Sequence, residues 1–229
     1  MNKILIETIN LKKTYKHLNG DITLFNNLNL KIKQGDLVAL VGPSGSGKSS
    51  LLHLLALLDE PTRGDIKLND ISTKKFKDEK KDEIRRKNIS IIFQDNNLLN
   101  DFTAIENVMM PLIIKGENLV NAKNKAKKIL KAVNILERSQ HFPNELSGGE
   151  QQRVAIARAL IAETNLILAD EPTGNLDFKT SQEIFSYFLK LKKLKKTIIF
   201  ATHNRELANR ADYKLLISNG DIKRVNARQ

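Results

Sequence analysis

Short apolar runs alternate with longer segments of mixed polarity along most of the chain. Runs of this kind, bounded by glycine or polar residues, are typical of strands. The pair Asn19-Gly20 and the segment 60–64 (Glu-Pro-Thr-Arg-Gly) predict turns. We predict strands at 4–11, 22–32, 37–41, 65–68, 88–93, 165–169, 197–201, 213–218 and 222–225.

Helical periodicity separates the later strands from one another. Segments 49–58, 150–162, 180–194 and 204–211 carry apolar residues at helical spacing. A strand, a helix and a further strand in succession predict parallel strands that helices cover. The fold class is therefore α/β, with a mostly parallel sheet and a β-rich segment before it.

The composition changes between residues 95 and 145. Alanine, lysine and leucine at helical spacing dominate there, and Pro111, Gly116 and Pro143 are expected to break the helices. We predict a helical subdomain at 95–145, inserted into a core made of 1–94 and 146–229. Residues 1–229 then form a single domain.

The last two predicted strands, 213–218 and 222–225, are separated by a turn at Asn219-Gly220. A type I′ turn needs positive φ at both central residues, which asparagine and glycine tolerate. The chain is therefore expected to end in an antiparallel hairpin.

The composition and the apolar runs limit the cellular compartment in which the chain is expected to act. It has no cysteine, which excludes disulfides, thiolate zinc sites and a cysteine nucleophile. No apolar run approaches the roughly 20 residues that span a bilayer. The N-terminus, Met1-Asn-Lys-Ile-Leu-Ile-Glu7, does not resemble a signal peptide. We expect a chain that stays in the cytosol and meets a membrane only through a partner.

The net charge of +12 is compatible with nucleic acid or an anionic surface as a partner. The lysines, however, are mixed with acids in 74–87 and follow solvated helix faces in 123–131 and 190–196. Tryptophan is absent, so a platform for stacking single strands is poorly supplied. No nucleic-acid partner is expected.

Residues 42–49 read Gly-Pro-Ser-Gly-Ser-Gly-Lys-Ser, a G-x-x-x-x-G-K-S phosphate-binding loop between a predicted strand and a predicted helix. Its backbone N–H groups can surround phosphate oxygens, and Lys48 adds a positive charge. Ser49 offers a hydroxyl to Mg²⁺. The glycines that let the backbone approach the ligand are Gly42, Gly45 and Gly47.

A second glycine-rich helix start lies at 146–151, Leu-Ser-Gly-Gly-Glu-Gln. Ser147 and Glu150 have the spacing of a capping box, which explains the serine and the glutamate. A cap does not explain Gly148 and Gly149, which suit the close approach of a phosphate. Two such helix starts suggest a nucleotide held between two surfaces.

The strand 165–169 ends at two adjacent carboxylates, Asp170 and Glu171. Ligands of open α/β sheets bind outside the carboxyl ends of the strands. Asp170 fits a carboxylate that holds Mg²⁺, usually through water. Glu171 can orient and deprotonate an attacking water.

Three single residues leave two interpretations open. Tyr15 either stacks on a base or belongs to the core. Gln94 either contacts Mg²⁺ or ends a strand. His203 either contacts a γ-phosphate or caps the next helix.

Together these segments resemble the ATP-binding subunit of an ABC transporter. The matching features follow that family's order: Tyr15, the loop 42–49, Gln94, the signature 146–151, Asp170-Glu171, Gly174-Asn175-Leu176-Asp177 and His203. The resemblance implies a P-loop NTPase core, an N-terminal antiparallel β subdomain and an inserted helical subdomain. It also implies a head-to-tail homodimer that closes on two ATP molecules, with Mg²⁺.

The resemblance assigns roles residue by residue. It implies catalysis by Lys48, Glu171 and His203, and Mg²⁺ ligation by Ser49, Gln94 and Asp170. The ATP-binding residues that it implies are Tyr15, Gly42, Pro43, Ser44, Gly45, Ser46, Gly47, Lys48, Ser49, Ser50, Gln94, Ser147, Gly148, Gly149 and Asp177. Pro43, Ser50 and Asn204 depart from the commoner residues without removing a ligand atom.

Within the family, 51–55, 58–62 and 98–108 resemble the branch that powers lipoprotein release and its relatives. That likeness implies two transmembrane permease subunits and a peripheral place on the cytoplasmic face of the inner membrane. It implies release of lipoproteins for transfer to the outer membrane. The alternatives are macrolide-type efflux, a cell-division permease, or a nucleic-acid-associated ATPase; the last class usually has long coiled coils or two cassettes, which this chain lacks.

Overall fold

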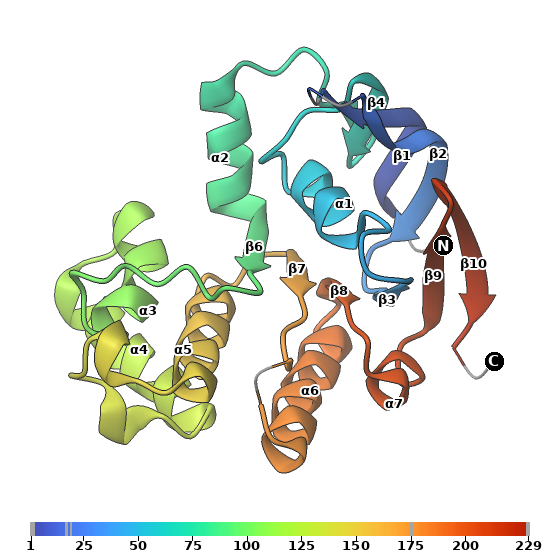
Figure 1. Cartoon of the computed structure of the whole chain (residues 1–229). Helices are drawn as coiled ribbons and strands as arrows, with labels where there is room; N and C mark the ends of the chain where they lie inside the picture. The colour runs from blue at the N-terminus through green and yellow to red at the C-terminus, as the bar shows by residue number, and fades with distance from the viewer. Residues whose placement is uncertain (1–2, 17, 19, 175, 228–229) are drawn as a thin grey trace.

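The structure, a computed structural model, describes residues 3–16, 18, 20–174 and 176–227. Asn19 of the predicted first turn lies outside them, as do Asn175, Met1 and Asn2. Within the described residues the strands form two sheets, with strand orders β2-β1-β4-β5 and β10-β9-β3-β8-β7-β6 (Figure 1).

The six-stranded sheet is mostly parallel, as predicted. Its parallel strands are β3 (Leu37–Val41), β6 (Ile89–Ile92), β7 (Leu166–Asp170), β8 (Thr197–Ala201) and β9 (Tyr213–Ser218). β10 (Asp221–Asn226) pairs antiparallel with β9. Asn219 and Gly220 have φ of 51° and 79°, which confirms the predicted turn of the hairpin.

Both faces of this sheet are buried because alternate residues of each strand enter two different cores. In β3, Leu37 and Ala39 belong to the core beneath the helices of the second half of the chain. Val38 and Leu40 belong to the core around α1 (Lys48–Leu55). Strands buried on both faces are continuous apolar runs, which is the pattern that the sequence shows.

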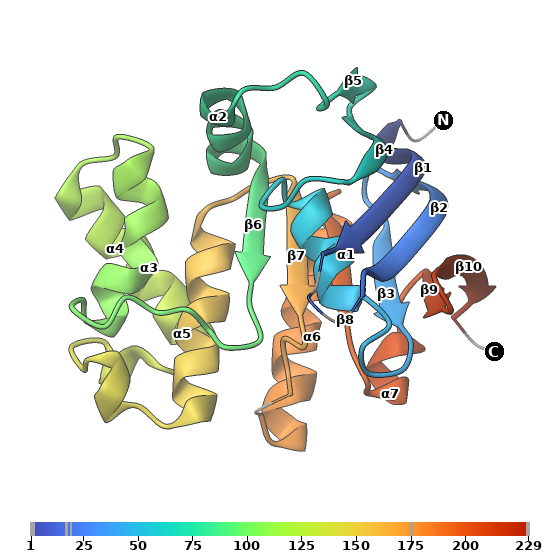
Figure 2. The ribbon, with the colours of Figure 1, turned by 45° about the horizontal axis from the view of Figure 1, so that its top comes forward.

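The N-terminal sheet is antiparallel and lies over α1. It consists of β1 (Ile4–Tyr15), β2 (Ile22–Lys33), β4 (Arg63–Leu68) and β5 (Ile71–Ser72). Its buried residues share one core with α1 and with the six-stranded sheet, so α1 is enclosed between the two sheets (Figure 2).

Helices fill the segment between β6 and β7. They are α3 (Ala104–Ile114), α4 (Leu119–Ala132), the short 3-10 helices η1 (Leu136–Arg138) and η2 (Pro143–Glu145), and α5 (Gly148–Ile161). Figure 1 shows α3, α4 and α5 together on one side of the molecule, away from the antiparallel sheet. The exact division at 95 and 145 stays a prediction.

One predicted break is wrong. Pro111 lies inside α3 rather than ending it. Proline deprives the helix of one N–H bond, but Val108 and Leu112 on either side are buried, and their packing keeps the helix continuous. Gly116 does follow the end of α3, with φ of 88°.

Several helix bounds differ from the prediction. α1 ends at Leu55 rather than near Leu58, since Leu57 has φ of 58°. α7 (Arg205–Ala208) is shorter than 204–211, and α6 is Phe178–Lys193. None of the helices among the described residues has the length and apolar character that would cross a membrane.

A helix that the sequence pattern did not predict is α2 (Asp78–Asn88), whose residues are all at least partly exposed. It has no apolar face, so periodicity could not reveal it. Charge supports it instead: Glu83 pairs with Lys80 and Lys87, and Arg85 pairs with Asp82. Acids in the first turn and bases in the last also suit the helix dipole.

Candidate functional site

The phosphate loop joins β3 to α1, and its glycines serve two purposes. A Cβ at Gly42 would lie 2.4 Å from the Ile217 carbonyl oxygen, and one at Gly47 would lie 2.8 Å from the Phe25 ring. These two positions therefore need glycine for packing within the protein. At Gly45 (φ 75°) no atom lies within 4 Å of such a Cβ, which leaves open space for a ligand.

Lys48, the first residue of α1, is 8% exposed. Its Nζ donates hydrogen bonds to the carbonyl oxygens of Gly42 (2.9 Å) and Pro43 (3.0 Å). Neutral carbonyls leave its positive charge uncancelled, so the loop can attract an anion. Ser46 Oγ is buried without a hydrogen-bond partner, a further polar atom available to a ligand. Pro43, Ser44 and Gly45 are exposed, and Ser49 and Ser50 are partly buried.

Asp170 ends β7 and is 8% exposed, and Glu171 follows it in a left-handed conformation with φ of 45°. The Glu171 N–H donates to the Ala201 carbonyl oxygen at 3.1 Å, so β8 fixes this unusual backbone. Burial raises the pKa of Glu171 above its ordinary value, although His203 and Lys48 oppose the rise. The loop lysine and this carboxyl therefore belong to one electrostatic environment.

His203 contacts Glu171 in two ways. Its backbone N–H donates to Glu171 Oε2 (3.3 Å), and its Nε2 lies 3.3 Å from Oε1. Oε1 is buried and has no hydrogen-bond partner. The helix-cap interpretation of His203 is wrong, because the side chain of Asn204 caps α7 by accepting the Leu207 N–H.

A cavity of about 580 Å³ brings Gln94, Glu171 and His203 together from three separate parts of the chain. Gln94 lies two residues beyond the end of β6. Gly174, Thr202 and Asn204 also line the cavity. Oxygen donors and a titratable pair at the carboxyl ends of parallel strands are typical of a ligand site.

The signature segment begins α5. Ser147 is its N-cap, and the predicted capping box is present: the Ser147 N–H donates to Glu150 Oε2 (2.8 Å), and Ser147 Oγ accepts the Glu150 N–H (3.4 Å). Ser147 and Gly148 are exposed. A Cβ at Gly148 would have no neighbour within 4 Å, so packing among the described residues does not require glycine at this position.

Asp177 caps α6. It accepts hydrogen bonds from the Thr180 N–H (3.0 Å) and Thr180 Oγ1 (2.6 Å), which hold the pKa of its carboxyl below the ordinary value. Tyr15 ends β1 and is 39% exposed, so its assignment to the core is wrong. ATP binding by either residue stays a prediction.

The sequence analysis did not predict one contact that lies close to the site. Arg158 on α5 donates to the carbonyl oxygens of Asn96 and Asn97, both at 2.7 Å, and so fastens the loop after Gln94. The signal was available: an arginine interrupts the otherwise apolar run 154–160. A cation in such a run needs buried acceptors.

Comparison with known proteins agrees with this geometry. The family described as ABC transporter matches residues 25–174. The lipoprotein-releasing system ATP-binding protein LolD of Rickettsia bellii (strain RML369-C) is 49% identical, over 93% of this chain and 96% of that protein. LolD of Legionella pneumophila (strain Lens) is 41% identical, over 97% and 98%.

Among solved structures, the ATP-binding cassette MJ0796 in a dimeric post-hydrolysis state with ADP and Pi superimposes with a TM-score of 0.94. It is 38% identical and covers 98% of this chain and 100% of its own. The fold, the phosphate loop and the identity across nearly the whole length lead to one conclusion: the chain belongs to the ABC transporter family and is an ATPase.

Proposed function

We propose that this ATPase is the subunit that powers release of lipoproteins from the inner membrane, for transfer to the outer membrane. The observation that carries the proposal is the 41–49% identity with LolD proteins over nearly the full length of both chains. The alternatives of efflux and cell division share the nucleotide site, and the client is chosen by the permease.

In the proposed reaction Glu171 is the general base. Its carboxyl lies in the cavity with Gln94 and His203, and burial raises its pKa toward the range in which a carboxylate takes a proton from water. His203 holds Glu171 through its backbone N–H, and in this proposal its ring would contact the γ-phosphate of bound ATP. Lys48 neutralises charge on the terminal phosphates.

The residues proposed for Mg²⁺ suit that ion. Ser49, Gln94 and Asp170 offer a hydroxyl, an amide oxygen and a carboxylate, the oxygen donors that Mg²⁺ prefers. Mg²⁺ usually keeps several waters and shares phosphate oxygens, so three protein ligands are sufficient. When bound, the ion would neutralise charge on the β- and γ-phosphates.

We further propose that two copies enclose two ATP molecules. The phosphate loop of one copy would face the signature serine and glycines, Ser147–Gly149, of the partner subunit. The exposed Ser147 and Gly148 and the open space beside Gly148 support this arrangement, because they leave room at the start of α5 for a ligand carried by the partner subunit. A twofold interface then produces two equivalent sites.

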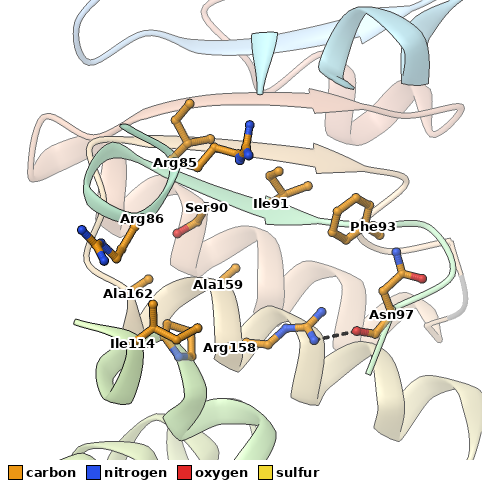
Figure 3. Close-up of a pocket in the computed structure, with 12 residues that line it drawn as sticks. Arg85, Arg86, Ser90, Ile91, Phe93, Asn97, Ile114, Arg158, Ala159 and Ala162 are labelled. Atoms are coloured by element: carbon orange, nitrogen blue, oxygen red, sulfur yellow. Dashed lines mark hydrogen bonds between the residues drawn. The ribbon is translucent and has the colours of Figure 1, made fainter. Parts of the chain in front are cut away.

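The permease is proposed to dock beside the loop that follows Gln94. A cavity of about 340 Å³ opens there between α2, β6, α3 and α5. Figure 3 shows Ile91 and Phe93 on its sheet side, Ile114 and Ala159 opposite, and Arg85, Arg86 and Arg158 around it. Phe93 and Asn97, on either side of Gln94 in the sequence, line this cavity. A movement of Gln94 would therefore shift residues that a partner in the cavity contacts. Docking would hold the chain on the cytoplasmic face of the inner membrane.

The first test is purification of the tagged protein from native membranes in mild detergent, followed by mass spectrometry. Two related permeases with large periplasmic regions would support lipoprotein release. Recovery of a division-type or efflux-type permease would contradict lipoproteins as the transported substrate, and the ATPase assignment would be unaffected. Recovery of nucleic acid or ribosomes in place of a membrane protein would contradict the transport role.

The docking surface has its own test. Charge reversal at Asp101, or Phe102→Ser, should reduce recovery of the permease and uncouple transport, while ATPase activity of the isolated subunit stays. Both residues are exposed just before α3. A matched change on the opposite side of the molecule, Lys223→Glu on β10, should leave recovery intact. Equal recovery with all three variants would contradict docking at 95–115.

A further inference from the structure

Lys13 and Asp59 form a polar cluster with Tyr15, at the ring to which base stacking is assigned. We propose that Lys13 and Asp59 are positioning residues that set the Tyr15 ring against the adenine of ATP. The inference rests on the proposed function, because it takes Tyr15 as the residue on which the base lies.

Asp59 binds both other members of the cluster. Its Oδ1 lies 2.6 Å from Lys13 Nζ, and its Oδ2 accepts a hydrogen bond from the Tyr15 hydroxyl at 2.9 Å. Lys13 Nζ also donates to the Glu60 carbonyl oxygen (2.9 Å) and lies 4.5 Å from the centre of the Tyr15 ring. The ring is therefore held at its hydroxyl and over one face.

The cluster lies at the end of the antiparallel sheet that packs on the phosphate loop. Tyr15 pairs with Ile22 on β2, and Lys13 pairs with Phe25. Phe25 is the residue that a Cβ on Gly47 would approach to 2.8 Å. Phe25 of β2, the strand paired with β1, thus lies against the phosphate loop, and for this reason we assign the ring to the base of the nucleotide whose phosphates that loop would bind.

Burial makes the lysine unusual. Lys13 is 8% exposed, whereas Tyr15 is 39% exposed. A desolvated ammonium over an aromatic face is attracted more strongly than an exposed one. Because it covers one face, a base can approach only the other. The cation draws ring electron density toward itself, and the free face becomes a better partner for an electron-rich purine.

A purely structural role is the competing explanation, since the same contacts tie β1 to the turn at 59–60. Only a positioning role makes the effect depend on the base. Inorganic tripolyphosphate uses the phosphate loop but has no base, and it therefore separates the two explanations.

The test compares Lys13→Met and Tyr15→Leu, singly and together, in the dimeric ATPase. We expect Lys13→Met to raise the KM for ATP about tenfold, with kcat within about twofold of the wild type. The inhibition constant of tripolyphosphate should stay unchanged. The KM for ATP of the double variant should be no higher than that of Tyr15→Leu alone, because Lys13 acts on the base only through the Tyr15 ring.

The matched control is Lys31→Met. Lys31 also pairs with an acid in this sheet, its Nζ lying 2.8 Å from Glu7 Oε1, but it takes no part in the cluster. Its KM for ATP should not change. If Lys13→Met lowers the melting temperature more than the control does, the KM for ATP is measured in Tyr15→Phe instead. It removes only the hydroxyl, and about a threefold rise in KM is expected.

Three results would overturn the inference, and they differ in whether they also contradict base stacking by Tyr15. An unchanged KM with Lys13→Met or Tyr15→Phe, beside a raised KM with Tyr15→Leu, refutes only the positioning role. Equal losses of ATP and tripolyphosphate affinity indicate a structural role. An unchanged KM with Tyr15→Leu refutes base stacking itself, and the inference with it.

Discussion

At the scale of single residues, the environment of Glu171 accounts for most of the proposed chemistry. Its Oε1 is buried without a hydrogen-bond partner, its backbone is left-handed, and β8 fixes its N–H. A carboxyl held in this way lowers the stability of the fold, and such costs concentrate at functional sites.

Replacing the base should separate binding from turnover. Glu171→Gln is expected to bind ATP with wild-type affinity and to lose about 10²–10⁴-fold in kcat, the usual contribution of a general base. Steady-state hydrolysis and equilibrium binding of a fluorescent ATP analogue measure the two effects. Turnover near that of the wild type would remove Glu171 from the reaction. Lys48→Ala should instead weaken binding itself.

The same residue predicts a dependence of stability on pH. A raised pKa in the folded state means that the folded protein binds more protons than the unfolded one above pH 4.5, the ordinary value. The contribution of Glu171 to stability is therefore present at low pH and is lost as pH rises through the raised pKa. Glu171→Gln should melt at a higher temperature than the wild type at neutral pH, with a difference that shrinks toward pH 4. A lower melting temperature at neutral pH would contradict the assigned burial effect.

At the scale of elements, helix starts carry functions that the sequence alone leaves ambiguous. Ser147, Asn204 and Asp177 all cap helices, yet only the surroundings of each distinguish a cap from a ligand contact. His203 is the clearest case: the sequence could not decide between cap and site, and the neighbouring Asn204 takes the cap. Two residues adjacent in sequence divide the tasks in a way that spacing cannot reveal.

A cap can be tested against a binding role. Asp177→Ala should lower the free energy of unfolding by about 1 kcal/mol, the usual cost of losing a cap. Asn118→Ala is the matched control, because Asn118 caps α4 in the same way, accepting the Asn121 N–H at 2.9 Å. Denaturant unfolding measures both losses. A rise in the KM for ATP with Asp177→Ala alone would support its predicted part in ATP binding. Equal stability loss and equal KM in the two variants would limit Asp177 to the cap.

Most elements could be predicted because both faces of the six-stranded sheet are buried. β3 is apolar at every position, and β7 and β8 are apolar except for Asp170 and Thr197 at their ends, so composition identifies these strands without any alternation. α2 could not be predicted in this way, since charge pairs rather than an apolar face support it. Pro111 was misleading for the opposite reason: tertiary packing outweighs a local helix breaker.

The site residues follow the same division. The loop 42–49 and the pair Asp170-Glu171 could be found because their patterns are local. The cavity that joins Gln94 to Glu171 and His203 depends on which strands are neighbours, and no sequence spacing encodes that order. The contact between Lys13 and Asp59, which are 46 residues apart, could not be predicted for the same reason.

At the scale of the whole molecule, the start of α5 and the phosphate loop both carry exposed residues, Ser147 and Gly148 on one and Pro43, Ser44 and Gly45 on the other, that would face a second copy in the proposed dimer. We expect Glu171→Gln with ATP and Mg²⁺ to double in mass by light scattering, because slow hydrolysis traps the closed dimer. Without nucleotide the measured mass should be that of a single copy. Ser147→Arg should prevent the doubling, because the larger side chain would occupy the space needed by the phosphates of the ATP bound to the other copy. A constant mass in all samples would contradict nucleotide-driven closure.

The cavity beside β6 has a consequence for solubility. β6 is the last strand of its sheet and is only Ile89–Ile92, an apolar edge whose backbone could pair with another chain. Arg86 is exposed beside that edge and is expected to act as a gatekeeper, since like charges on two copies repel. A variant that replaces Arg86 with an apolar residue should aggregate when the subunit is produced alone, and production together with the permease should keep it in solution.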